Sequence, residues 1–441
     1  MSMEKLNAMN GAQCSCGKIH TYDTQVYVGK GVVENIPQYL QQYAPKKAFV
    51  LSDPNTYKAA GEKVCSVLKK AGMAYSAYSF THDPIEPDEY SVGSMMMHYD
   101  PKCDVIVAVG SGVVNDLGKI LSNISGKPYM IVGTAPSMDG YASATSSMTR
   151  DGLKTSLPSR AADIIVGDVD ILCQAPMHMM KSGLGDMLAK YVSICEWRIA
   201  NLLLDEYYCE EIADLIRSAL KACVDNAEGL LKRDPAAVQA VFEGLVIGGV
   251  AMNYAGLSRP ASGGEHYLSH VIDMRAVEFG TPMDLHGIQC AIGTLISAKL
   301  YEKIKTIKPN AEKAKAYVAA FSTEDWFATL RQLLGKGAEA MIAQEAREGK
   351  YDKAKHATRL EDIITNWDAI LQIIEEELPS VAVLDKLMDT IEAPKTLEEI
   401  GLDSRDLPVY FKATKDIRDK YVLSRLCWDL GIIDEIVEGV K

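Results

Sequence analysis

The stretch Val107-Ala-Val-Gly-Ser-Gly-Val-Val-Asn-Asp116 decides the fold of this 441-residue chain. It begins as a buried-type apolar strand, passes through a glycine-containing turn, and ends at an Asn-Asp pair that opens a helical pattern. Gly110 and Gly112 permit positive φ and close approach of an anion to backbone amides, and a helix N-terminus adds partial positive charge. The stretch predicts either a phosphate-binding turn or a tight strand-to-helix connection that binds nothing.

The regions on either side of this stretch differ in their periodicity. Short β-branched runs alternate with amphipathic stretches over the first third of the chain, which is typical of βαβ units and a parallel sheet. The predicted strands are 48–51, 75–80, 105–109, 129–132 and 164–166, with helices over 55–71 and from 115 onward. After about Cys173, helix formers at 3.6-residue spacing dominate, over 183–204, 207–227, 236–254 and 287–307. We therefore expect an α/β, Rossmann-like dinucleotide-binding domain over 1–172 and an all-α metal- and substrate-binding domain over 173–441.

Charge and composition restrict the possible partners. The net charge of −13 would repel nucleic acid and anionic lipid, so neither is expected to bind. Residues 1–13 contain no segment of signal-peptide type, and the apolar runs at 105–109 and 245–252 are too short to span a bilayer. A cytoplasmic protein is the expectation.

The ten cysteines are scattered, which favours reduced thiols that fill core space. Only Cys14 and Cys16, with His20 nearby, suggest a metal site. No fourth ligand follows in zinc-site spacing, so we favour the alternative of a loosely ordered N-terminal segment.

Two further segments suggest a nucleotide. Asp53 follows a predicted strand, where its carboxylate could accept hydrogen bonds from an adenosine ribose or could cap the next helix. The loop 132–143 also follows a strand, and its Thr134, Ser137 and Ser143 could reach the nicotinamide ribose or phosphate. A solvent-exposed loop is the alternative, but the carboxyl ends of parallel strands are where α/β proteins bind ligands.

Three of the eight histidines lie in one window and indicate a metal. His266 and His270 are four residues apart and share a face if they lie on a helix, and His286 begins another segment. Asp186 is the best anionic partner, because it is placed in the first turn of an apolar helix whose glycines allow close packing. One aspartate and two histidines suit Zn²⁺, Ni²⁺ or Fe²⁺. The alternative is a helix-capping aspartate and satisfied core histidines.

Four strings together carry a resemblance to a known family. They are Gly110-Ser-Gly-x-x-Asn-Asp, Thr134-Ala-Pro-Ser-Met-Asp-Gly, Gly183-x-Gly-Asp-x-x-x-Lys and Ser258-Arg-Pro-Ala-Ser-Gly-Gly-Glu-His266. In order and spacing the chain resembles the iron-type, group III alcohol dehydrogenase superfamily, with glycerol dehydrogenase and dehydroquinate synthase as broader relatives. The likeness is strongest to the bacterial glycerol-1-phosphate dehydrogenases associated with arabinose operons. It implies a homodimer with an N-terminal α/β and a C-terminal helical domain.

The resemblance also implies roles for individual residues. Asp186, His266 and His286 would hold the metal, while His270 and Asp139 would approach the substrate. The residues implied for the dinucleotide are Asp53, Gly112, Val113, Val114, Asn115, Asp116, Thr134, Ala135, Pro136, Ser137 and Ser143. Ser111 departs from the wider superfamily, whose pattern has three consecutive glycines there, whereas the glycerol-1-phosphate branch resembles the sequence at this position.

The expected reaction is the reversible NAD(P)H-linked reduction of dihydroxyacetone phosphate to sn-glycerol 1-phosphate. The acidic chain needs a local cation for the phosphate, and Arg259 is the first candidate, with Lys154 and Arg160 as alternatives. Asp53 would repel a 2′-phosphate and so favours NADH. The alternatives are a glycerol dehydrogenase-like enzyme acting on an uncharged polyol, a dehydroquinate synthase-like lyase, and a non-catalytic nucleotide-binding protein.

Overall fold

The computed structural model describes residues 2–82 and 84–440 of the chain. These residues form two compact units, one built from the chain up to Met187 with Asp214–Gly256, the other from Leu188–Ala213 with the chain from Leu257 onward. The units thus interleave along the sequence, whereas the sequence predicted one boundary, between residues 172 and 173.

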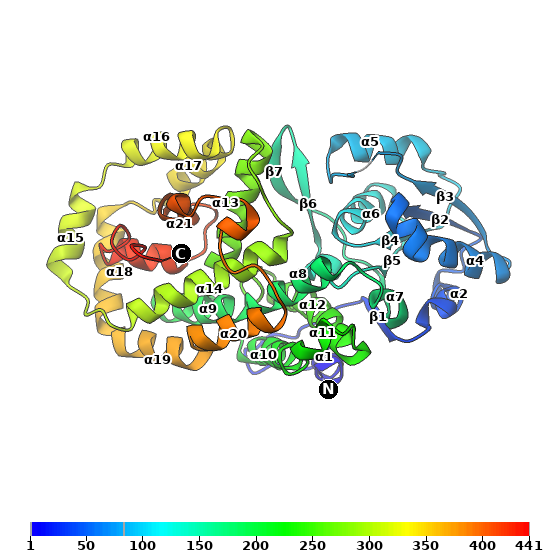
Figure 1. Cartoon of the computed structure of the whole chain (residues 1–441), viewed down its shortest axis with the longest axis horizontal. Coiled ribbons are helices and arrows are strands. Elements are labelled where there is room, and N and C mark those ends of the chain that lie inside the picture. The colour runs from blue at the N-terminus through cyan, green and yellow to red at the C-terminus, as the bar shows by residue number, and fades with distance from the viewer. Residues whose placement is uncertain (1, 83, 441) are drawn as a thin grey trace. The chain divides into compact units, whose positions relative to one another are not determined.

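The first unit is built around a parallel β-sheet (Figure 1). Its strands are β1 (Gln25–Gly29), β2 (Lys47–Ser52), β3 (Ala74–Ser79), β4 (Val105–Gly110), β5 (Tyr129–Gly133) and β8 (Ile164–Asp168), and a separate hairpin comprises β6 (Thr145–Arg150) and β7 (Leu153–Pro158). The helices are α1 (Ser2–Met9), α2 (Ile36–Tyr39), α3 (Pro54–Thr56), α4 (Glu62–Lys70), α5 (Glu89–His98), α6 (Gly112–Ser125), α7 (Val169–Leu172), α8 (Met177–Leu188), α10 (Glu210–Asp225), α11 (Ala227–Leu230) and α12 (Pro235–Ala255). The predicted α/β class is confirmed.

The strand order is β1-β8-β5-β4-β2-β3, with every neighbouring pair parallel. From β2 the chain moves to β3 on one side, and from β4 it moves to β5 on the other. Right-handed crossovers in opposite directions place the connecting helices α4 and α6 on opposite faces of the sheet. The point where the direction reverses lies between β2 and β4, and open α/β sheets bind their ligands at such a point.

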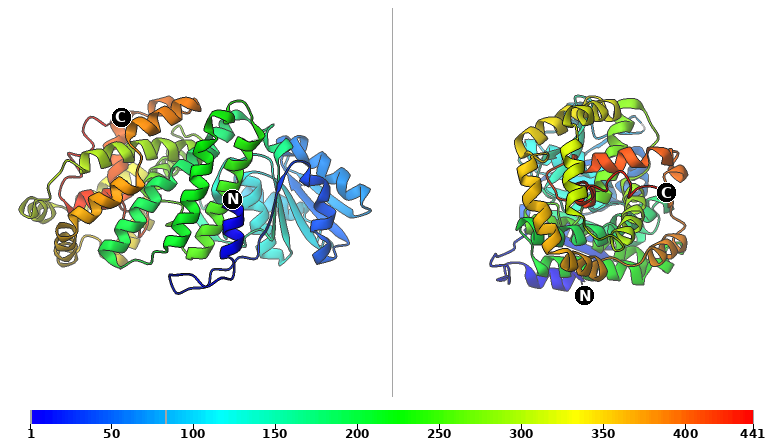
Figure 2. Two further views of the ribbon diagram at one scale, coloured as in Figure 1. Left: turned by 90° about the horizontal axis from the view of Figure 1, so that it is seen from below. Right: turned by 90° about the vertical axis from the view of Figure 1, so that its left-hand side faces the viewer.

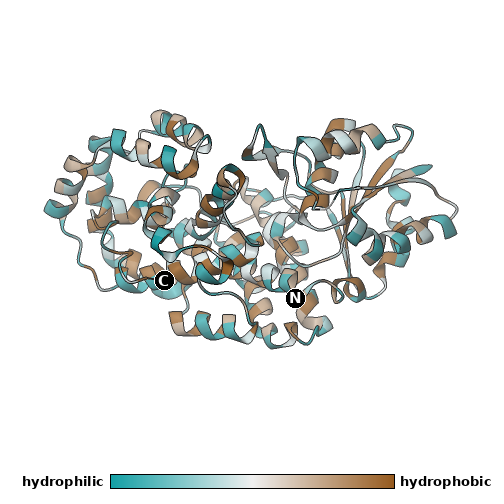
Figure 3. Cartoon of the chain, turned by 45° about the horizontal axis from the view of Figure 1, so that its top comes forward, coloured by the Kyte–Doolittle hydropathy of each residue, from teal (hydrophilic) through white to brown (hydrophobic). Residues whose placement is uncertain are grey.

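Strand β4 shows why a central strand of this sheet appears in the sequence as an unbroken apolar run. Every residue from Val105 to Gly110 is buried, because both faces of the sheet are covered. Val105, Val107 and Val109 pack in one apolar core with the helix α4 side chains Val64 and Leu68, and the alternate residues face the other side. Hydropathy colouring shows apolar residues along the strands and mixed colours along the helices (Figure 3).

Helix α12 lies at the carboxyl end of part of the sheet. Its Phe242 ring is so close to β5 and β8 that a Cβ on Gly133 or Gly167 would come within 2.8 Å or 2.3 Å of it. Helix α12 is long and apolar enough to cross a membrane by length and composition, but 67% of that window is buried in the structure. The helix therefore acts as a core element of this unit.

The second unit is helical over its described residues. Its helices are α9 (Lys190–Leu204), α13 (Gly264–Phe279), α14 (His286–Ile304), α15 (Ala311–Ala320), α16 (Thr323–Leu334), α17 (Gly337–Glu348), α18 (Lys353–Thr365), α19 (Trp367–Glu377), α20 (Val381–Thr390), α21 (Leu407–Thr414) and α22 (Leu423–Asp429). One continuous apolar core joins α9, α13 and α14 to the C-terminal helices. Val192, Val271 and Ile292 are among its fully buried members.

Two predictions of local structure need correction. The helix expected over 183–204 is interrupted at Ala189, so that α8 ends at Leu188 and α9 begins at Lys190. The β6–β7 hairpin was missed, although its turn, Asp151-Gly152, has positive φ at both residues (55° and 72°). An Asp-Gly pair is a strong hairpin signal for that reason.

Candidate active site

The expected nucleotide segments meet at the reversal point of the sheet. Asp53 follows β2, and the Ser111-Gly112 turn follows β4, which is the neighbouring strand with Leu51 paired to Ala108. Asp53 Oδ1 accepts hydrogen bonds from the amides of Asn55 (2.7 Å) and Thr56 (2.9 Å). The carboxylate thus caps the following helix, and the cap holds it at the carboxyl end of β2.

Helix α6 directs its first amides toward the same edge. The N–H groups of Gly112, Val113 and Val114 have no partner within the helix, since the first helical bond runs from the Asn115 amide to the Ser111 carbonyl oxygen. Such amides can bind phosphate. Neither Gly110 nor Gly112 adopts the positive φ that glycine permits. A Cβ on Gly110 would instead lie 2.5 Å from the Val114 side chain, so close packing is what requires glycine there.

Asn115 and Asp116 are already engaged within the fold. Asn115 is fully buried, donates to the Gly140 carbonyl oxygen (3.0 Å) and accepts from the Tyr129 hydroxyl (2.9 Å). Asp116 forms an ion pair with the buried Lys119 (2.9 Å). These contacts fix the start of α6 against the loop after β5, so both residues position the Ser111-Gly112 turn.

The loop after β5 is packed against helix α8. The buried hydroxyl of Ser137 hydrogen-bonds that of Ser111, and the Ser137 carbonyl oxygen accepts from Ser182 Oγ (2.9 Å). A Cβ on Gly183 would lie 1.9 Å from the Pro136 carbonyl oxygen. The first glycine of the Gly-x-Gly-Asp string therefore lets α8 approach the loop, as the sequence predicted.

The remaining residues expected in this loop are also buried. Thr134 and Ala135 are 6% and 2% exposed, and the Thr134 amide donates to the Gly110 carbonyl oxygen (3.1 Å). The Ser143 hydroxyl bonds the carbonyl oxygens of Gly140 and Thr145. The loop is thus an ordered wall rather than a solvent-exposed connection.

Asp186 is held by the same loop. It is fully buried, and its Oδ2 accepts a hydrogen bond from the Asp139 amide (2.9 Å). The carboxylate oxygens of Asp139 and Asp186 approach within 4.8 Å of one another. Asp186 lies in the last turn of α8, not in the first turn of a helix as predicted, so it is not an N-cap. Two acidic groups this close favour a cation beside them.

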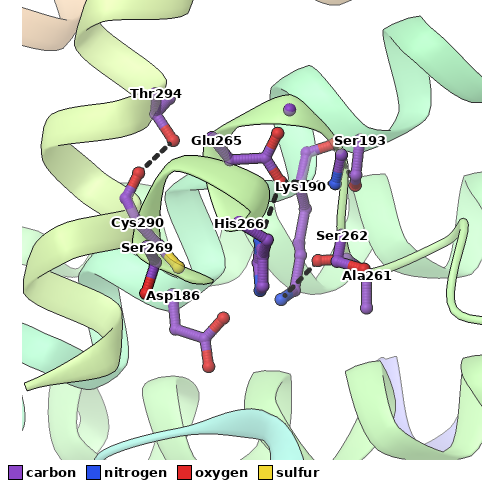
Figure 4. Close-up of polar contacts among 12 residues, drawn as sticks. Asp186, Lys190, Ser193, Ala261, Ser262, Glu265, His266, Ser269, Cys290 and Thr294 are labelled. Atoms are coloured by element: carbon purple, nitrogen blue, oxygen red, sulfur yellow. Dashed lines mark hydrogen bonds and ion pairs between the residues drawn. The ribbon is translucent and has the colours of Figure 1, made fainter. Parts of the chain in front are cut away.

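In the second unit, two imidazoles are fixed in orientation, and Figure 4 shows one of them, His266, beside Glu265. His266 Nδ1 hydrogen-bonds Glu265 Oε1 (2.8 Å), and Oε1 also accepts from the Gly263 amide (2.7 Å). His286 Nδ1 hydrogen-bonds Ser269 Oγ (3.0 Å). A histidine held through Nδ1 presents Nε2 to a metal, and a carboxylate partner raises its basicity.

His270 and Cys290 lie beside these imidazoles. The His270 ring centroid is 6.1 Å from that of His286, and the His266 and His286 centroids are 5.0 Å apart. Cys290 Sγ is 3.5 Å from His286 Nε2. Burial opposes ionisation of the Cys290 thiol, but the two imidazoles outweigh it and lower its pKa. The thiol adds a third potential ligand to this unit, one that sequence reasoning missed although it follows His286 by one helical turn.

Arg259, expected at the phosphate, is buried in an ion pair. Its Nε and Nη2 bond both oxygens of the Glu206 carboxylate (2.7 and 2.5 Å), and Nη1 donates to the Tyr421 carbonyl oxygen (2.8 Å). Of the two alternatives, Arg160 pairs with Asp163 in the first unit and Lys154 lies in strand β7.

Buried ionisable side chains lie next to helix α13, which carries His266, and sequence reasoning missed them. Glu196 accepts from the amides of Gly264 (2.7 Å) and Leu423 (2.8 Å). Burial, with the charge of Glu265, raises the pKa of Glu196 to about 8. Lys420 Nζ donates to the Ser262 carbonyl and hydroxyl oxygens (2.6 Å each), and burial lowers its pKa to about 7. Perturbed groups of this kind concentrate at functional sites.

Known proteins resemble the chain over most of its length. A family model described as iron-containing alcohol dehydrogenase matches residues 27–176. A glycerol-1-phosphate dehydrogenase [NAD(P)+] of Halalkalibacterium halodurans is 32% identical over 296 residues, covering 66% of this chain and 74% of the relative. The chain belongs to the glycerol-1-phosphate dehydrogenase family. A relative with the same name from Methanothrix thermoacetophila is 34% identical over 278 residues, covering 63% of this chain and 77% of the relative.

Solved structures support the fold of the family. A glycerol dehydrogenase from Schizosaccharomyces pombe matches with a TM-score of 0.57 at 17% identity, covering 94% of this chain and 89% of that one. An NADH-dependent butanol dehydrogenase from Thermotoga maritima matches with a TM-score of 0.60 at 15% identity, covering 95% and 98%. These similarities confirm the expected group III alcohol dehydrogenase fold.

Proposed function

We propose that the chain is a metal-dependent NAD(P)H-linked oxidoreductase that reduces dihydroxyacetone phosphate to sn-glycerol 1-phosphate, reversibly. The relatives named above support this activity. The observation that carries the proposal is the pair His266 and His286, each held through Nδ1 so that Nε2 is the nitrogen for a metal.

We propose Asp186, His266 and His286 as the metal ligands. The donors fit: Asp186 is a fully buried carboxylate in the first unit, and both imidazoles of the second unit are oriented by side chains. One carboxylate and two imidazoles suit Zn²⁺, Ni²⁺ and Fe²⁺ alike. When bound, such an ion acts as a Lewis acid toward the carbonyl group of the substrate.

For the dinucleotide we propose the reversal point of the sheet. The α6 amides Gly112–Val114 would bind the pyrophosphate, and the loop Thr134–Ser137 with Ser143 would line the nicotinamide half. Asp53 would hold the adenosine ribose, and its charge favours NADH over NADPH. The bound dinucleotide supplies the hydride.

The protein must also orient the substrate and supply a proton. His270, one turn after His266, is proposed to hold a substrate hydroxyl and pass a proton to the new alcohol oxygen. Asp139 would accept from another hydroxyl. Arg259 could take the phosphate only by releasing Glu206, whose carboxylate it now binds with two nitrogens. We further expect a homodimer in the cytoplasm.

Initial rates test the proposal. The enzyme is stripped of metal, reloaded with zinc, nickel or iron, and assayed with dihydroxyacetone phosphate and with dihydroxyacetone, using NADH and NADPH. We expect reloading to restore activity, preference for the phosphate ester, and no turnover in Asp186→Ala or His266→Ala. Full activity without metal would refute the mechanism. Equal rates on both substrates would indicate an uncharged polyol, and turnover without net cofactor oxidation would indicate a lyase.

A further inference from the structure

We propose that Cys14, Cys16 and His20 bind a structural zinc ion that ties the N-terminal segment of the chain to helix α12. The potential ligand atoms of the three side chains all lie within 4.8 Å of one another. Cys16 Sγ and His20 Nε2 are 3.4 Å apart. Zn–S and Zn–N bonds of about 2.3 and 2.05 Å at the tetrahedral angle place these two atoms about 3.6 Å apart. The observed separation therefore suits two ligands of one ion.

The His20 ring is oriented as a zinc ligand would be. Its Nδ1 lies 3.1 Å from the Tyr254 carbonyl oxygen in the last turn of α12, and the side chain is 3% exposed. A bond from Nδ1–H to a carbonyl oxygen selects the tautomer whose Nε2 lone pair faces the metal. That Nε2 is the atom directed toward Cys16.

The backbone turns the two cysteines toward the same point. The Cys14 amide donates to the Lys18 carbonyl oxygen (3.0 Å), and the Gly17 amide donates to the Cys14 carbonyl oxygen (3.0 Å). Gly17 has a φ of 84°, in the left-handed region where glycine is favoured. The result is a tight turn that brings the sulfur atoms of Cys14 and Cys16 within 4.8 Å of each other, closed where the Gly11 amide donates to the His20 carbonyl oxygen (2.8 Å). The segment turns back on itself after α1 (Figure 2, left).

This segment contains no apolar core that would hold the turn. Between Gly11 and His20, the buried side chains are those of Cys14 and His20, while Ile19 is 59% exposed. A metal ion bound by its side chains would hold such a short segment in one conformation. The ten cysteines are all thiols rather than disulfides, and two sulfurs with one imidazole are donors that zinc prefers. A fourth position remains for another protein group or water.

Cobalt substitution and metal analysis of the full chain test the site. With Co²⁺ in place of zinc, the wild-type protein should show near-ultraviolet thiolate-to-metal charge transfer, and the purified protein should retain about one equivalent of zinc that is lost in Cys14→Ser/Cys16→Ser. The matched control, Cys65→Ser/Cys103→Ser, removes two buried thiols of the same unit and should retain both signals. Cys290→Ser separates this band from any thiolate of the candidate active site, because the band should persist in that variant.

Limited proteolysis gives a readout that does not depend on the spectrum. Lys18 lies exposed in the turn, and trypsin should cleave after it at least about tenfold faster when the zinc is removed. The dehydrogenase rate of Cys14→Ser/Cys16→Ser should stay near that of the control double variant, so failure of this proposal and failure of the proposed activity are distinguishable. The proposal is overturned if the wild-type protein shows no thiolate–cobalt band, or shows a disulfide between Cys14 and Cys16.

Discussion

Replacement of Gly183 by alanine tests whether activity depends on the contact between α8 and the Thr134–Ser137 loop. The added Cβ would lie 1.9 Å from the Pro136 carbonyl oxygen and 2.7 Å from its carbonyl carbon, and both are backbone atoms. Real Cβ atoms essentially never come within 3.0 Å of a neighbour. Helix α8 and the loop must therefore separate by about 1.1 Å, because no flexible side chain can yield.

That displacement carries two costs. Overpacking of a tight core contact costs about 1–3 kcal/mol, which for a unit of this size lowers Tm by roughly 2–12 °C. The displaced groups are the Pro136–Ser137 loop, proposed to line the nicotinamide, and Asp186, three residues further along α8. A misplacement of about 1 Å at reacting groups can reduce kcat about 100-fold.

Thermal melts, NADH titration and initial rates measure both effects. The matched control is Gly93→Ala in α5, an exposed helical position where an added Cβ meets nothing within 4 Å. Gly93→Ala should raise the free energy of unfolding by about 0.5–1 kcal/mol and leave kcat unchanged. If Gly183→Ala binds NADH and turns over like the wild type, with an unchanged Tm, then the glycine is not needed for this contact and the reasoning fails.

Two further predictions concern the second unit. Glu265→Gln keeps an acceptor for His266 Nδ1 but removes the charge, so metal affinity and kcat should each fall about 10–100-fold. The control is Glu312→Gln, at an exposed position. Unchanged metal affinity in Glu265→Gln would argue against the role of Glu265. Burial lowers the pKa of Lys420 to about 7, whereas its pKa in the unfolded chain is about 10.4. Between these two pH values folding releases the proton, so the free energy of unfolding increases as pH rises through this window. The contribution is lost as pH falls through about 7. Lys420→Met should flatten that rise in urea unfolding, and parallel curves for the two proteins would contradict the assignment.

The sheet could be predicted because its signals are local. All five predicted strands are present within a residue or two, since buried parallel strands read as unbroken apolar runs. The strand of the six-stranded sheet that was missed, β1, lies at the sheet edge and is half-buried throughout, so it carries no such run. The helix that carries Asp186 was predicted with the wrong bounds for another reason. Apolar periodicity continues through Ala189, and only the three-dimensional packing ends one helix there and begins the next.

The sequence allowed candidate site residues to be chosen by residue type, but it did not allow the hydrogen bonds and ion pairs that hold them to be predicted. The sequence indicated Asp53 and the α6 turn because both follow strands, and strand order then brought those strands together as neighbours. The ion pair of Arg259 with Glu206 joins residues 53 positions apart, and the bond from Glu196 to the Leu423 amide joins residues 227 apart. No periodic pattern links such pairs, because their partners are set by tertiary packing.

The hydrogen bonds made by the histidine rings distinguish candidate metal ligands from packing residues better than the spacing of the histidines in the sequence does. In His20, His266 and His286 the atom held by the protein is Nδ1, which meets a backbone carbonyl, a carboxylate and a hydroxyl respectively. Nε2 of His20 and of His286 lies 3.4–3.5 Å from a cysteine sulfur. His356 is as buried as His20 and His266, yet its Nε2 is bound to the Asp429 carbonyl oxygen (2.9 Å), as in an imidazole that serves packing. A ring anchored at Nδ1, with Nε2 facing another donor, is poised to share an ion. By this criterion the N-terminal turn, which spacing alone gave little reason to consider, is as well prepared for a metal as the helix that carries His266.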